Sequence, residues 1–166
     1  MSGPAELQQW LEAQGFVSDP ELAQTGERFT DFLASFRPGQ PQPAPSAFDV
    51  ATSGPVILRE LPFYSLCAHH LLPFFGTADV LYVPSQRVVG LGGVPSLLRH
   101  FAHQPQLQER LGEQLAQALQ DLLAPRGLLI RLSARQMCME MRGAESAGLV
   151  QTFASRGDDQ ALFGLL

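Results

Sequence analysis

The chain has 166 residues, of which 45% are hydrophobic and 16% charged, a composition typical of one globular domain with a buried core. Sixteen acidic residues outnumber 11 basic ones, and the net charge of −5 argues against nucleic acid or an anionic membrane as the partner, because both require a basic face. All 11 basic residues are arginines, which excludes Schiff-base chemistry and a P-loop, since both need a lysine.

The N-terminal sequence MSGPAELQQWLEAQG lacks the basic region and apolar stretch of a signal peptide. No apolar run approaches the roughly 18–20 residues that cross a bilayer. We therefore expect a cytoplasmic protein with reduced thiols. Its two cysteines, Cys67 and Cys138, are too few for a disulfide scaffold, which leaves metal binding, catalysis or an inert core position as their role.

Two helices are predicted before the first proline-rich stretch. Residues 4–14 have the apolar spacing of a short amphipathic helix. Asp19 is a suitable N-cap and Pro20 a suitable first residue for a second helix that reaches Phe36, although Gly26 lies inside it.

Residues 37–54 are rich in proline and polar residues and predict an extended linker. Residues 1–36 are too few to bury a core of their own. We therefore expect residues 1–166 to form a single domain, in which N-terminal helices and the linker precede a core over residues 55–166.

The predicted core alternates strands with one long helix. Apolar runs bounded by turn residues indicate the strands, and leucines at helical spacing indicate the helix. Strands are expected at residues 55–61, 78–84, 88–91, 128–134 and 149–155, and the helix at about 105–123. Strands that follow one another so closely favour an α+β fold with an antiparallel sheet and helices on one face.

The densest group of reactive side chains is Cys67-Ala68-His69-His70, directly after a predicted strand. Thiolate and imidazole are preferred zinc ligands, and Cys67-x-x-His70 can place both on one ion from a tight turn. With Cys138, the chain would supply three ligands and leave a fourth position to water, as catalytic zinc sites do. His69 would then stand unligated beside the metal, where it can transfer protons. The alternative is that both cysteines are small buried hydrophobic residues.

Several blocks of the sequence, in the same order, resemble the GTP cyclohydrolase I family. The family's C-E-H-H signature corresponds to Cys67-Ala68-His69-His70 within LPFYSLCAHHLLPFFGTADVLYVP. The likeness continues through VVGL, QPQLQERL and MCMEMRG, and TGERF is similar to the start of a family helix. The resemblance therefore extends over nearly the whole chain.

This resemblance implies a T-fold, in which an antiparallel sheet carries two helices on one face and assembles into a barrel-like ring, commonly a decamer with active sites between subunits. It also implies a reaction. The family opens the imidazole ring of GTP by hydrolysis at carbon 8, releases formate and recloses the ring to give 7,8-dihydroneopterin triphosphate.

The resemblance assigns roles to individual residues. Cys67, His70 and Cys138 match the zinc ligands, and His69 matches a catalytic proton donor.

The substrate-binding positions match as well. Gln108 and Glu109 match residues that recognise the guanine edge, and Arg142 matches a residue that contacts the phosphates. Gln136 stands where the family has a histidine that takes part in proton transfer; an amide forms hydrogen bonds but does not titrate.

The sequence also departs from the family at other positions. Ala68 replaces the glutamate of the C-E-H-H signature, and Gly92 and Gly93 stand in a block that carries phosphate-binding cations in the family. A buried triphosphate needs cations, which leaves three arginines, Arg99, Arg135 and Arg156, as candidate replacements.

Three alternatives to GTP hydrolysis therefore stay open. The chain could act on another guanine or purine derivative, or it could stop at the formylated intermediate. It could also be a non-catalytic, pterin- or purine-binding T-fold subunit.

Overall fold

The computed structural model describes residues 3–16, 19–37, 39–52 and 54–166. The chain divides into two units, residues 1–37 and residues 38–166. Among the residues described, no helix is both long and apolar enough to cross a membrane.

The first unit contains the two helical segments expected from the sequence. Helix α1 spans Gly3–Ala13, and the carboxylate of Asp19 accepts a hydrogen bond from the Glu21 backbone N–H at 2.9 Å, which confirms the predicted cap. The second segment is broken into a 3₁₀ turn, η2 (Pro20–Leu22), and helix α2 (Thr25–Ser35). Gly26 is required where the helices cross, because a Cβ there would lie 2.4 Å from the Pro4 carbonyl oxygen.

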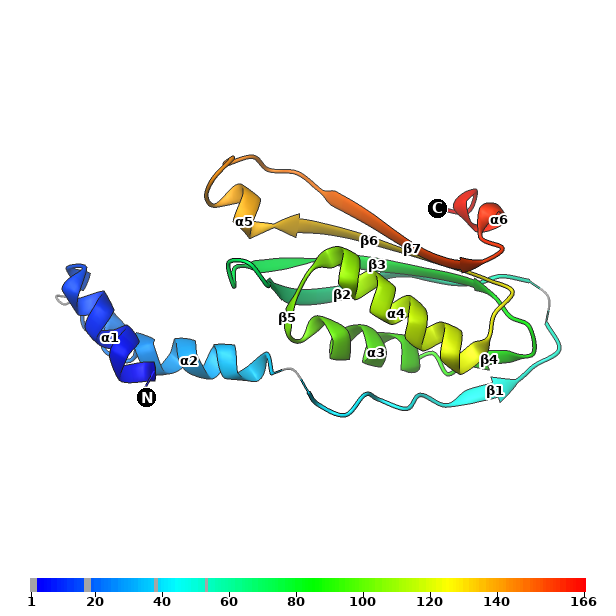
Figure 1. The fold of residues 1–166 in the computed structure, drawn as a ribbon, viewed down its shortest axis with the longest axis horizontal. Helices are drawn as coiled ribbons and strands as arrows, with labels where there is room; N and C mark the ends of the chain where they lie inside the picture. Colours follow the sequence, from blue (N-terminus) through cyan, green and yellow to red (C-terminus); the bar gives the residue numbers. More distant parts are fainter. Residues whose placement is uncertain (1–2, 17–18, 38, 53) are drawn as a thin grey trace. The chain divides into compact units, whose positions relative to one another are not determined.

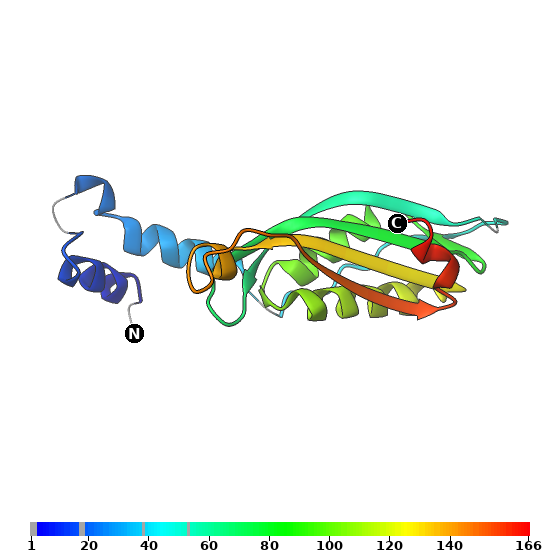
Figure 2. The same cartoon turned by 90° about the horizontal axis from the view of Figure 1, so that it is seen from above.

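The second unit is built on a five-stranded sheet in the order β5-β2-β3-β6-β7 (Figure 1). Its strands are β2 (Val56–Cys67), β3 (Pro73–Val83), β5 (Pro105–Gln106), β6 (Gly127–Gln136) and β7 (Val150–Gly157). The long strands run alongside one another in Figure 2. Neighbouring strands are antiparallel except β2 and β5, which are parallel. The sheet is therefore mixed, which corrects the expectation of a wholly antiparallel one.

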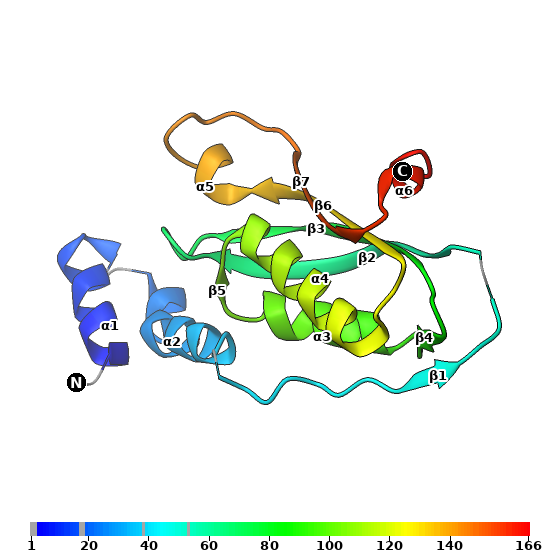
Figure 3. The ribbon, with the colours of Figure 1, turned by 45° about the vertical axis from the view of Figure 1, so that its right-hand side comes forward.

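Helices α3 (Gly93–Ala102) and α4 (Gln108–Leu123) lie side by side over the sheet (Figure 3). The core forms between these helices and the sheet, where Leu111, Leu115 and Leu119 of α4 are fully buried. The α+β layout with helices covering a sheet is thus confirmed. The sequence pattern missed α3, because Gly92, Gly93 and Pro95 resemble a turn.

Shorter elements complete this unit. They are β1 (Ala47–Asp49), β4 (Arg87–Val89), α5 (Met137–Glu140) and α6 (Gln160–Phe163). Strands β1 and β4 pair as a separate two-stranded sheet. Leu162 of α6 packs with Leu81 and Leu129 in a second, smaller apolar cluster.

Candidate metal centre and substrate site

The turn after β2 brings Cys67 and His70 together. The Leu71 backbone N–H donates to the Cys67 carbonyl at 2.8 Å, and the Cys67 N–H donates to the Leu72 carbonyl at 2.8 Å. Leu71 adopts a φ of 53°, which closes the turn within a few residues. The Cys67 Sγ consequently lies 4.0 Å from the His70 Nδ1.

Cys138 reaches the same place from a distant part of the sequence. It lies in α5, which directly follows β6, and Gln136 at the end of β6 pairs with Phe74 at the start of β3. The ligand atoms of Cys67, His70 and Cys138 all lie within 4.8 Å of one another. The sequence prediction that these three residues converge is therefore confirmed.

The three side chains fit a zinc ion. Zinc bonds of about 2.3 Å to sulfur and 2.0 Å to nitrogen place tetrahedral ligand atoms roughly 3.5–3.8 Å apart, close to the arrangement of this cluster. Burial raises the pKa of the Cys138 thiol, and the adjacent Cys67 thiol raises that pKa further. A cation between the two sulfurs would reverse this effect, because it stabilises both thiolates.

Two further polar side chains stand beside the cluster. His69 is exposed, and its ring centroid lies 6.2 Å from that of His70. Arg142, just after α5, donates from Nη1 to the His70 Nε2 at 2.7 Å. The side chain of Arg142 is exposed, so it can also reach a ligand from solvent.

Strand β5 ties the start of α4 to the metal-ligating turn. Cys67 pairs with Gln106, and the Ala68 N–H donates to the Gln106 carbonyl at 2.9 Å. Gln106 is buried and donates from Nε2 to the Phe101 carbonyl at 3.0 Å. Sequence reasoning missed Gln106, since one glutamine in a polar stretch carries no signal of burial.

Gln108, the first residue of α4, is 3% exposed, and both polar atoms of its side chain form hydrogen bonds. Its Nε2 donates to the carbonyl oxygens of Leu132 at 3.2 Å and Val150 at 2.9 Å. Its Oε1 accepts from the Gln136 Nε2 at 2.6 Å. The two glutamines thus form one amide chain that joins α4 to β6 and β7, whereas the neighbouring Glu109 is exposed.

Two of the three candidate replacement cations already have acidic partners. Arg135 pairs with Glu140 and lowers the pKa of that carboxyl group. Arg156 pairs with Glu113 at 2.7 Å. Arg99 is exposed near the end of α3.

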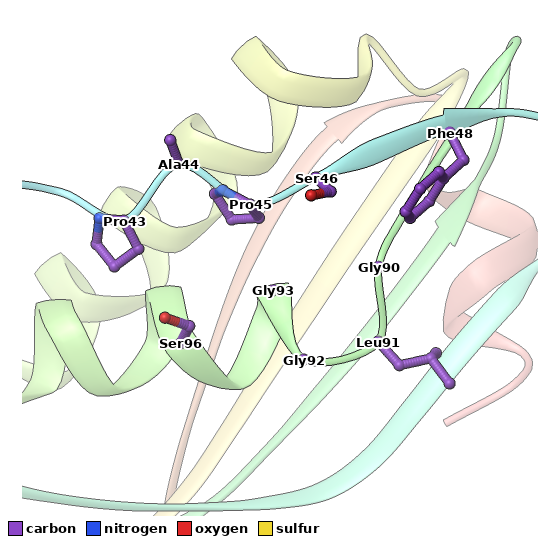
Figure 4. Close-up of a pocket in the computed structure, with 10 residues that line it drawn as sticks. All are labelled: Pro43, Ala44, Pro45, Ser46, Phe48, Gly90, Leu91, Gly92, Gly93 and Ser96. Carbon is purple, nitrogen blue, oxygen red and sulfur yellow. The ribbon is translucent and has the colours of Figure 1, made fainter.

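Gly92 and Gly93 line a cavity of about 450 Å³ between the segment 43–48 and the start of α3 (Figure 4). The lining residues are Pro43, Ala44, Pro45, Ser46, Phe48, Gly90, Leu91, Gly92, Gly93 and Ser96, and none carries a charge. A Cβ on Gly93 would lie 2.6 Å from the Pro45 Cβ, whereas a Cβ on Gly92 would meet nothing within 4 Å. The segment that covers α3 therefore requires glycine at position 93 but not at position 92.

Comparisons with known proteins identify relatives of this chain. The family model described as GTP cyclohydrolase I matches residues 5–161. The GTP cyclohydrolase 1 of Streptococcus agalactiae serotype Ia is 40% identical over 148 residues, which cover 86% of this chain and 79% of that protein. The GTP cyclohydrolase 1 of Campylobacter jejuni is 47% identical over 105 residues, 63% of this chain. That match spans only 55%, about half, of the Campylobacter protein's length.

A solved structure shares the fold at low sequence similarity. The apo crystal structure of the archaeosine synthase QueF-Like matches with a TM-score of 0.50 and 16% identity. The match covers 64% of this chain and 97% of that protein. This similarity supports the fold alone.

Proposed function

The chain belongs to the GTP cyclohydrolase I family, and on that premise we propose that it hydrolyses the imidazole ring of GTP to give 7,8-dihydroneopterin triphosphate and formate. The observation that carries the proposal is the convergence of Cys67, His70 and Cys138, drawn from two distant segments, into a cluster that fits zinc. The start of α4, which carries Glu109, is tied to the same turn through β5.

Different side chains bind the metal, transfer the proton and bind the substrate in this proposal. Zinc held by the cluster would act as a Lewis acid that lowers the pKa of a water molecule. His69 stands beside the cluster and transfers a proton to the guanine ring nitrogen as the ring opens. The exposed carboxylate of Glu109 accepts hydrogen bonds from the guanine N–H groups, which selects against bases that lack them. Arg142 contacts the phosphates.

The amide chain gives Gln108 and Gln136 a positioning role in this scheme. Both hydrogens of the Gln108 Nε2 are used by strand carbonyls, and its Oε1 is used by Gln136. Gln108 therefore fixes the first turn of α4, and Gln136 supports it without supplying a titratable group. Recognition of the guanine edge by side chains then rests on Glu109.

We extend the proposal to the assembly and location that the family implies, a cytoplasmic ring of ten single-domain chains with active sites between subunits. Gly92 lies at the start of α3, whereas β5 follows the end of α3 and pairs with Cys67 of the metal-ligating turn. A helix of 10 residues separates these regions by roughly 15 Å. A second copy that brings its own α3 start to the metal cluster would complete the site.

A second candidate function is favoured by the uncharged cavity beside Gly92 and Gly93. A guanine compound with fewer phosphates would need fewer cations there. Formate release and fluorescence of the oxidised pterin, measured with each compound, distinguish GTP from a guanine compound with fewer phosphates as the substrate. GTP hydrolysis predicts both signals with GTP at catalytic rates, whereas activity with guanosine or its monophosphate alone would contradict GTP as the substrate.

Adding a cation at position 92 is expected to strengthen binding of the triphosphate. Gly92→Lys places its side chain in open space, whereas Gly93→Lys must displace Pro45. We expect Gly92→Lys to lower the KM for GTP by about tenfold, as a new charge pair would. The matched variant Gly93→Lys is expected to lower the melting temperature instead. An unchanged KM in Gly92→Lys would show that the triphosphate does not bind at this end of α3.

A further inference from the structure

The contact between Arg142 and His70 determines which imidazole nitrogen carries hydrogen. A guanidinium group only donates hydrogen bonds. The His70 Nε2, 2.7 Å from the Arg142 Nη1, must therefore offer its lone pair. In a neutral imidazole the hydrogen then sits on Nδ1, which faces the Cys67 Sγ at 4.0 Å.

The hydrogen bond from Arg142 opposes metal binding by His70, although the ligand atoms of the three-residue cluster are close enough together for zinc. A ligating nitrogen must present a lone pair, so Nδ1 binds a metal only when the hydrogen is on Nε2. The Nε2–H and the Arg142 N–H would then be two donors facing each other. If Nε2 were the ligating atom instead, Arg142 would occupy the position of the metal. In either case the contact between Arg142 and His70 must break.

We propose that metal binding at Cys67, His70 and Cys138 is positively coupled to the binding of an oxyanion by Arg142. The inference rests on the metal centre of the proposed function. Metal binding releases the guanidinium from His70, and an oxyanion that draws the guanidinium away frees His70 to bind metal. Because coupling between two ligands is reciprocal, each strengthens the binding of the other by the same factor.

The surroundings of Arg142 support this exchange. Its side chain is exposed, and among the described residues no ion pair gives it a carboxylate partner, in contrast to Arg135 near the end of β6, which pairs with Glu140 of α5. An anion therefore competes with the His70 ring, which accepts a hydrogen bond from Arg142, and with the Cys138 thiol, whose pKa the Arg142 charge lowers. Since that hydrogen bond is solvent-exposed, we expect a coupling of about threefold or somewhat more.

The test measures the zinc dissociation constant of the full chain by competition with a chromophoric chelator. Titrations are run in sodium chloride and in sodium sulfate at equal ionic strength, because sulfate is a tetrahedral oxyanion that binds zinc weakly in solution. The wild-type protein is expected to bind zinc about threefold or more tightly in sulfate. Arg142→Gln is expected to bind zinc at least as tightly as the wild type in chloride and to show no response to sulfate.

Arg135→Gln is the matched control, since it removes the same charge from the neighbouring strand without touching His70. It should keep the sulfate response. A wild-type protein that binds zinc equally in both salts would overturn the coupling and leave the metal centre intact. A wild-type protein that binds no zinc in either salt would contradict the proposed function itself.

Discussion

Replacing Cys138 with serine is expected to remove zinc from the protein and to reduce turnover of GTP to below about 1% of wild type. The cluster has three protein ligands, and the hydroxyl of serine is a much poorer zinc ligand than a thiolate. Metal analysis of purified protein should show about one zinc per wild-type chain and almost none in the variant.

The control for Cys138→Ser is Met141→Leu, which changes an exposed side chain just after α5. It should retain zinc and activity. A Cys138→Ser protein with one tightly bound zinc per chain would show that the metal is held elsewhere.

Glu109 and Gln108 are adjacent in sequence, yet we expect substitution of Glu109 to impair catalysis and substitution of Gln108 to impair stability. Glu109→Gln removes the carboxylate that accepts from guanine and should lower kcat/KM for GTP by at least about 100-fold. Because the Glu109 side chain is exposed, the melting temperature of the Glu109→Gln protein should stay near that of wild type.

Gln108→Met keeps the length of the side chain but removes its three hydrogen bonds. The carbonyls of Leu132 and Val150 lose a donor, and the Gln136 amide loses its acceptor. We expect a decrease of about 2–4 kcal/mol in the free energy of unfolding. Chemical denaturation of both variants measures their free energies of unfolding, and steady-state kinetics with GTP measures their kcat/KM. A stable Gln108→Met protein with impaired guanine binding would instead place the Gln108 side chain on the substrate.

The metal cluster could be predicted from the sequence because two of its three ligands are close together in the chain. Cys67 and His70 share one turn, and their spacing is visible in the chain. Cys138 is the only other cysteine, so the number of possible third ligands was small. The strands on either side were also clear, because β2 and β6 are rich in apolar residues.

The burial and hydrogen bonding of the Gln108 side chain could not be predicted from its neighbours in sequence. Its burial depends on Leu132, Gln136 and Val150, which lie 24 to 42 residues away. The same holds for Gly93, where the crowding comes from Pro45 in the segment predicted as a linker. Both features arise from contacts between distant segments, which local patterns do not contain.

The fate of carbon 8 of the purine tests the central proposal most directly. Zinc-loaded protein is incubated with GTP labelled with ¹³C at carbon 8, and the label is followed by nuclear magnetic resonance. The account predicts that the label appears in free formate as the pterin forms. Label that accumulates in a formamide would show a reaction that stops after the first hydrolysis, and label that stays in intact GTP would contradict the proposed activity.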